Sequence, residues 1–168
     1  EDEVWNCLEK TLNISLDKLT KMREEEGKLL SDDIKQKANG IEDMLKAISE
    51  KSSDIVLEHK EKLWNRINEL LEDRYEIDEN KLANEVAYFA DKIGIDEEVV
   101  RLGSHIKQLR NILDNKGAIG RKLDFLLQEM NREVNTIGSK VGDIQITNYV
   151  VEIKTELEKI REQIQNIE

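Results

Sequence analysis

The chain has 168 residues, and apolar and charged residues each make up 38% of it. Globular proteins average about 45–50% apolar and ~25% charged residues, so this chain has little core for its surface. Its aromatic content of 4% argues against a β-rich core, and it contains no proline, the residue that breaks helix interiors. The composition favours an all-α fold with long helices, and no apolar run approaches the ~18 residues that a membrane span needs.

The first part of the chain, residues 1–75, is predicted to be a long helical arm. Gly27 and the pair Asn39-Gly40 weaken its helix without ending it, whereas Ser52-Ser53-Asp54 carries the residue types of a break and an N-cap. We therefore expect two helices that fold back on each other as an antiparallel coiled coil. Their apolar residues recur at steps of three and four, and in the first helix they are Trp5, Leu8, Leu12, Leu16, Leu19, Met22, Leu30, Ile34, Ala38, Ile41, Leu45 and Ile48.

Residues 76–168 are predicted to form a compact bundle of about four helices. The polar stretch EDRYEIDEN connects this bundle to the arm. Gly94 ends the first helix, as glycine commonly does, Asp96 caps the second, and Asp143 opens the last. The stretch KGAIG forms a turn before the third helix, which ends near Gly142.

The net charge of −11 argues at first against a nucleic-acid partner, but the charge is unevenly distributed. Residues 1–100 carry a net charge of −12, whereas residues 101–140 carry eight Lys or Arg and four Asp or Glu, a net charge of +4. A basic block in an acidic chain is weak evidence for a surface that binds polyanions. The helix that ends this block, GRKLDFLLQEMNREVNTIGSK, also holds unusually varied hydrogen-bonding residues.

Two sets of residues in this region are candidates for metal chemistry. Glu129 and Glu133 lie at i and i+4, so their carboxylates share one helix face and are close enough to share a cation. Glu98, Arg101 and His105 share a face of the preceding helix. A short turn joins that helix to the one that carries Glu129 and Glu133, so the two helices should pack antiparallel. Spacing alone favours plainer interpretations: a solvated face with Glu–Lys pairs for the first set, and a buried or surface-paired histidine for the second.

One histidine with several carboxylates suits Mg²⁺ or Mn²⁺, and such an ion would bind the scissile phosphate of RNA and activate water. We expect Glu129 and Glu133 to hold the ion. Glu98 or Asp124 would be a further ligand, and His105 a ligand or the proton-transfer group. Neighbouring groups of the RNA would be held by Arg101, Arg121, Lys122, Arg132, Asn135 and Lys140.

The stretches NEVAYFADKIGIDEEVVRLGSHIKQL, GRKLDFLLQEMNREVNTIGSK and VVEIKTELEKIREQIQNIE resemble the C-terminal domain of the bacterial YicC-like proteins. The resemblance is strong over about residues 76–168, and KMREEEGKLLSDDI in the arm is similar to the middle region of the family. The family's N-terminal domain has no counterpart here, so we expect the chain to be part of a longer protein. In the first two stretches the motif positions are Glu98, Arg101, Ser104, His105, Gly120, Arg121, Asp124, Gln128, Glu129, Arg132, Glu133, Asn135, Thr136, Ser139 and Lys140.

The resemblance implies a metal-dependent endoribonuclease of the bacterial cytoplasm that acts on single-stranded or structured RNA. It also implies a homo-oligomer, a hexameric ring with RNA in a central channel. The single cysteine, Cys7, agrees with a cytoplasmic location, since it cannot form a disulfide within the chain. A rival hypothesis of another class is a non-catalytic coiled-coil oligomerisation module of a larger RNA-processing protein, with the chemistry in a different domain.

Overall fold

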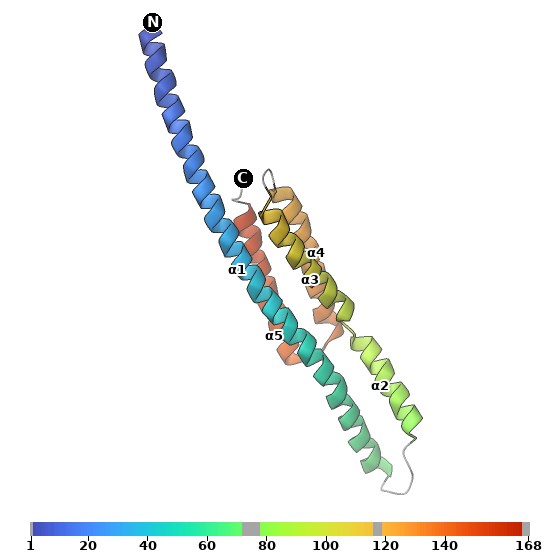
Figure 1. The fold of residues 1–168 in the computed structure, drawn as a ribbon. Helices are drawn as coiled ribbons and strands as arrows, with labels where there is room; N and C mark the ends of the chain where they lie inside the picture. The colour runs from blue at the N-terminus through green and yellow to red at the C-terminus, as the bar shows by residue number, and fades with distance from the viewer. Residues whose placement is uncertain (1, 72–77, 116–118, 166–168) are drawn as a thin grey trace.

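The computed structural model describes residues 2–71, 78–115 and 119–165, and over these ranges it consists of helices without a strand. The expected all-α fold is therefore confirmed. The predicted connector EDRYEIDEN lies largely outside the described residues, as does most of the KGAIG turn. The helices are α1 (Asp2–Leu71), α2 (Glu79–Ile93), α3 (Asp96–Leu113), α4 (Gly120–Lys140) and α5 (Ile144–Ile164) (Figure 1).

Helix α1 runs without interruption through the 70 residues from Asp2 to Leu71. Gly27 and Gly40 are tolerated within it, as expected, because a glycine costs only about 1 kcal/mol relative to alanine in a helix. The predicted break at Ser52-Ser53-Asp54 was wrong. Ser53 stays helical and donates its hydroxyl to the carbonyl of Ser49, 3.4 Å away, so the two-helix coiled coil expected within residues 1–75 does not form.

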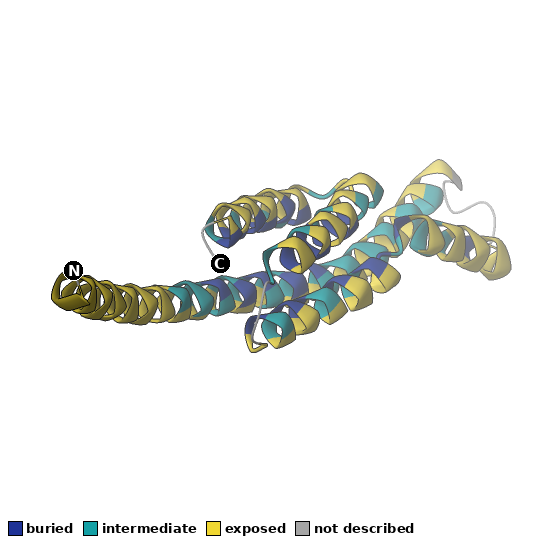
Figure 2. Cartoon of the chain, turned by 90° about the horizontal axis from the view of Figure 1, so that it is seen from above, coloured by how far each residue is buried: buried dark blue, intermediate teal, exposed yellow. Residues whose placement is uncertain are grey.

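The middle of α1 is one side of a four-helix bundle. Ile34, Ile41 and Ile48 are completely buried, and they belong to the same core as the buried residues of α3, α4 and α5. In this bundle α1 packs on α3 and α5, and α4 packs on both of those helices. Figure 2 shows the buried residues on the faces that the helices turn toward one another. The bundle thus draws on both sequence ranges, 1–75 and 76–168.

The two ends of α1 extend beyond the bundle in opposite directions (Figure 1). Its C-terminal end carries α2, where His59 stacks on Phe89 with ring centroids 3.6 Å apart. Its N-terminal end has no covering element among the described residues, and residues 2–26 are exposed throughout. The apolar seam of this end is therefore 46% to 68% exposed, and it comprises Trp5, Leu8, Leu12, Leu16, Leu19 and Met22.

The short connections follow the chemistry of helix ends. Asp143 caps α5 by accepting hydrogen bonds from the backbone N–H groups of Gln145 and Ile146, as its position predicted. Gly94 ends α2, also as predicted. Asp96 does not cap α3; it is the first helical residue, and Ile95 takes the cap position without a side-chain hydrogen bond. No helix in the described ranges is both long enough and apolar enough to cross a membrane.

The shared core predicts which substitutions in α1 destabilise the protein. Ile41→Ala removes a completely buried side chain, so we expect it to lower the free energy of unfolding by about 2–5 kcal/mol. Leu57→Ala is the matched control on the same helix, because Leu57 is 61% exposed and should cost no more than about 0.5 kcal/mol. Denaturant unfolding followed by circular dichroism measures both. Equal, small effects would mean that α1 does not belong to the bundle.

Candidate functional site

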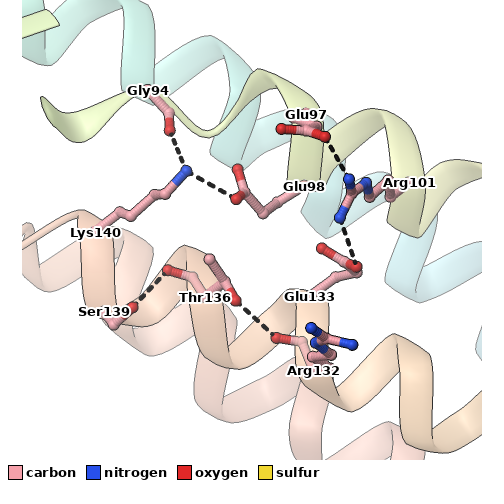
Figure 3. Close-up of polar contacts among 9 residues, drawn as sticks. All are labelled: Gly94, Glu97, Glu98, Arg101, Arg132, Glu133, Thr136, Ser139 and Lys140. Atoms are coloured by element: carbon pink, nitrogen blue, oxygen red, sulfur yellow. Dashed lines mark hydrogen bonds and ion pairs between the residues drawn. The ribbon is translucent and has the colours of Figure 1, made fainter. Parts of the chain in front are cut away.

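Helices α3 and α4 run antiparallel and enclose a polar cluster at their contact (Figure 3). Within the described ranges, Glu98 on α3 and Glu133 on α4 are the two buried charged residues, 7% and 5% exposed. A buried carboxylate is costly unless a cation and hydrogen bonds compensate it. The partners of these two groups therefore define the site.

Glu98 is held by Lys140 at the end of α4. The ammonium group of Lys140 donates hydrogen bonds to Glu98 Oε1, 2.8 Å away, and to the carbonyl of Gly94, 3.0 Å away. The other carboxylate oxygen, Oε2, is buried without a hydrogen-bond partner. Burial pushes the pKa of Glu98 upward, but the hydrogen bonds from Lys140 and the backbone, with the charges of Lys140 and Arg101, outweigh burial and hold the pKa below its usual value.

Glu133 is paired with Arg101 across the same contact. One guanidinium nitrogen of Arg101, Nη1, lies 3.7 Å from Glu133 Oε1, and the other hydrogen-bonds to Glu97 one turn earlier on α3 (Figure 3). Glu97 is not among the site residues predicted from the sequence. Its spacing of four residues before Arg101 was the available signal, since Glu–Arg pairs at i and i+4 face each other on a helix.

His105 lies on α3, one turn beyond Arg101, and is half-buried. Its Nδ1 atom is buried and has no hydrogen-bond partner. Because Glu98 faces Lys140 and Arg101 faces Glu133 in the antiparallel pair, His105 lies near the level of Glu129. Among the described residues three buried polar atoms have no hydrogen-bond partner within the chain, Glu98 Oε2, His105 Nδ1 and Gln163 Oε1, and the first two lie on α3.

The remaining predicted metal ligands lie apart from the buried carboxylates. Asp124 faces α5, where its Oδ1 lies 3.6 Å from Arg161 Nε, and it accepts a hydrogen bond from Gln128. Glu129 is exposed and lies 3.9 Å from Arg132. Across the described residues, no three or more His, Cys, Asp or Glu side chains are grouped so that they could hold a metal ion. The predicted ligand set is therefore not assembled there within one chain.

The basic block of the sequence divides into structural and solvent-facing cations. Arg110 is structural, because it donates hydrogen bonds to Glu42 and Asn39 of α1. Lys140 and Arg101 are occupied by the buried carboxylates. Arg121 and Lys122, by contrast, are exposed, and neither has an ion pair with any residue that the structure describes.

The solvent side of α4 forms a continuous stripe that we call the outer stripe. Its residues follow one another at steps of four and three, so they share one face of the helix, and all of them are exposed. None of them is acidic, although the chain as a whole has a net charge of −11. The outer stripe consists of Arg121, Phe125, Gln128, Arg132, Asn135 and Ser139.

The fold and the polar cluster define an all-helical protein in which a long scaffold helix supports a bundle with one charged helix contact. Residues 48–168 match the family model described as "Endoribonuclease YicC-like, C-terminal". The match covers most of the chain, so the chain belongs to the YicC-like endoribonuclease family, and the resemblance seen in the sequence is confirmed.

Two relatives extend this finding. The chain is 55% identical over 168 residues to the "Probable endoribonuclease YicC" of Clostridioides difficile (strain 630), covering all of this chain and 57% of that protein. It is 37% identical over 147 residues to the protein of the same description from Haemophilus influenzae, covering 88% of this chain and 50% of the relative. The chain thus spans about half the length of these relatives.

The Glu98–Lys140 pair predicts a pH-dependent effect of one substitution. Lys140→Met leaves Glu98 buried without its cation, so we expect the free energy of unfolding at pH 7 to fall by about 1–3 kcal/mol. This loss of stability should shrink as the pH falls below 4.5, the usual pKa of a glutamate side chain, because a protonated carboxyl needs no counter-ion. Lys122→Met, at an exposed position of the same helix, should show neither effect. A loss for Lys140→Met that is the same at pH 7 and pH 4 would contradict the pairing.

Proposed function

We propose that this chain is the RNA-contacting part of an endoribonuclease and that α4 is the helix that contacts RNA. The observation that carries this proposal is the outer stripe, a solvent-facing row of cations and hydrogen-bonding side chains in an acidic protein. The exposed carboxylate that borders the stripe, Glu129, lies 3.9 Å from Arg132. Arg121 and Lys122 have no ion pair with a described residue, so a polyanion partner would supply their counter-charge.

The proposed contacts divide by chemistry. Arg121, Lys122 and Arg132 would bind phosphate oxygens, which position RNA without reading its sequence. Asn135 offers both donors and acceptors, so it suits base edges or the ribose 2′-hydroxyl, the group that distinguishes RNA from DNA. Arg101 and Lys140 lie at the α3–α4 contact, where an RNA phosphate would have to compete for them with Glu133 and Glu98.

We further propose that the polar cluster between α3 and α4 is where the phosphodiester bond is hydrolysed. Imidazole both accepts and donates a proton near neutral pH, which suits His105 for proton transfer to or from a reacting oxygen. Glu133 would act with it from the facing helix, and Glu129 lies one turn away on the exposed side. Arg101 and Lys140 would neutralise the charge that builds on the phosphate.

The requirement for Mg²⁺ or Mn²⁺ remains a prediction from the sequence. The roles proposed for His105, Arg101 and Lys140 do not depend on a metal ion. The carboxylates of Glu98 and Glu133 each face a cationic side chain in this chain, and an ion needs oxygen ligands that are not already neutralised in this way. An ion at this place would therefore need further ligands, from RNA phosphates or from a second chain.

A second candidate function, assembly, is favoured by a different observation. The exposed apolar seam at the N-terminal end of α1 has the spacing of a helix-packing surface and is uncovered in the described chain. We propose that other copies of the chain, or other parts of a longer protein, cover it in a homo-oligomer. Assembly and RNA cleavage are compatible, because the seam and α4 lie at different places on the molecule (Figure 1).

RNA binding through the outer stripe predicts a characteristic salt dependence. Arg132→Gln should weaken the binding of single-stranded RNA by about fivefold at low salt. It should also make the slope of log affinity against log salt shallower by about 0.7, the value for one lost phosphate contact on a single strand. Lys92→Gln removes an exposed cation from α2 and is the matched control. Fluorescence anisotropy with a labelled RNA measures both, and equal slopes for the two variants would contradict the assignment to α4.

Catalysis in the α3–α4 cluster predicts which substitutions abolish cleavage. With Mn²⁺ or Mg²⁺, the chain should cut an end-labelled single-stranded RNA, and EDTA should stop it. Glu133→Gln should slow cleavage by about a hundredfold or more while RNA affinity changes little. Glu85→Gln, at an exposed position of α2, should leave the rate unchanged. RNA that the wild-type chain binds but does not cut would place the chemistry in another part of the longer protein.

A further inference from the structure

Phe125 is an exposed aromatic side chain in the middle of the outer stripe. The chain has two phenylalanines. Phe89 stacks on His59 between α1 and α2, whereas Phe125 is 65% exposed to solvent. Phe125 contributes nothing to the core of the bundle, so the fold does not explain why an aromatic residue stands at this position.

The neighbours of Phe125 on the stripe are polar or cationic. Arg121 lies one turn before it, Gln128 one turn after it and Arg132 two turns after it. At 1.5 Å per residue the two arginines are about 6 Å and about 10 Å from Phe125 along the helix axis. The stripe thus presents one aromatic ring with a guanidinium group on either side, and every one of these side chains is exposed.

We propose that Phe125 is a base-stacking residue of this helix. A base of a single-stranded RNA would lie against its ring while Arg121 and Arg132 bind phosphates on the two sides. This arrangement, a cationic track with an aromatic platform, is how proteins hold single strands without reading their sequence. The inference rests on the proposed RNA binding and adds to it the residue that would hold an unpaired base, since a duplex hides the base faces that would stack.

Charge complementarity favours RNA over a second protein chain as the occupant of this face. A helix-packing surface needs apolar residues at repeated steps of three and four, as at the N-terminal end of α1. The outer stripe has a single apolar side chain among two arginines, two amides and a serine. A protein partner covering it would bury the guanidinium group of Arg121, which has no ion pair with a described residue. A phosphate of RNA would supply that opposite charge, whereas Arg132 already lies 3.9 Å from Glu129.

The test compares Phe125→Ala, Phe125→Trp and Tyr88→Ala in the binding of a labelled single-stranded RNA. Tyr88, on α2, is 67% exposed and is therefore a matched control for the loss of a surface aromatic. Phe125→Ala should weaken binding by about five- to a hundredfold, while Phe125→Trp and Tyr88→Ala should bind as the wild type does. The salt slope of Phe125→Ala should stay that of the wild type, because no charge is lost. Inorganic polyphosphate, which has no bases, should bind Phe125→Ala and the wild type equally.

The outcomes separate this inference from the proposed function. A wild-type chain that does not bind RNA overturns RNA binding itself, and stacking with it, before any variant is made. If the wild type binds RNA and Phe125→Ala binds equally well, stacking alone is overturned. The same conclusion follows if Phe125→Ala weakens RNA and polyphosphate alike. A change in the sedimentation mass of Phe125→Ala with unchanged RNA affinity would assign the ring to an interface between copies of the chain.

Discussion

The need to compensate two buried carboxylates governs how α3 and α4 meet. Removing Glu98 and Glu133 from water costs several kcal/mol each, so each must face a cation. Lys140 forms an ion pair with Glu98, and Arg101 forms one with Glu133. The two pairs form together in only one antiparallel register. In that register His105 lies near the same contact, and the outer stripe of α4 faces solvent. The two ion pairs at the α3–α4 contact therefore help to determine which residues of α4 face solvent.

Helix α1 supplies the rigid support for this arrangement. Its buried isoleucines fill the core between α3 and α5, and polar contacts fix both of those helices to it. Arg110 of α3 bonds to Glu42, and Gln163 of α5 bonds to Asp33. Hydrogen bonds from Lys37 and Gln163 hold the pKa of Asp33 below its usual value, so this contact is strongest above the range in which Asp33 takes up a proton. Because α4 packs on α3 and α5, these contacts with α1 also fix the position of α4.

The helices themselves could be predicted from the sequence because their apolar residues keep a clear period and their ends carry Gly94 and Asp143. The break at Ser52-Ser53-Asp54 was predicted wrongly because cap residues are only weakly unfavourable inside a helix. There, packing decides: Ile48 is buried in the bundle and Ile55 is packed against its core. The sequence could not show that α1 is part of the bundle. A periodic row of apolar residues indicates which face of a helix is buried, but it does not indicate which element covers that face.

The candidate site was predictable in part. Spacing placed Glu98, Arg101 and His105 on one face and indicated that α3 and α4 would pack antiparallel, as they do. It could not show that Arg101 and Lys140 would be engaged by the carboxylates, because such pairing depends on side chains that meet only in the fold. Phe125 is not among the predicted site residues, although the spacing held a signal. Leu123, Leu127 and Met130 form the buried seam of this helix, and position 125 lies off that seam.

Ultraviolet cross-linking can show directly whether RNA lies on α4. A single-stranded RNA bound to the chain would be irradiated, and the cross-linked peptides identified by mass spectrometry. RNA contact along the outer stripe predicts cross-links within residues 120–140, with Phe125 among the modified positions and none in residues 2–26. Cross-links confined to α1 or α5, with residues 120–140 unmodified, would contradict it.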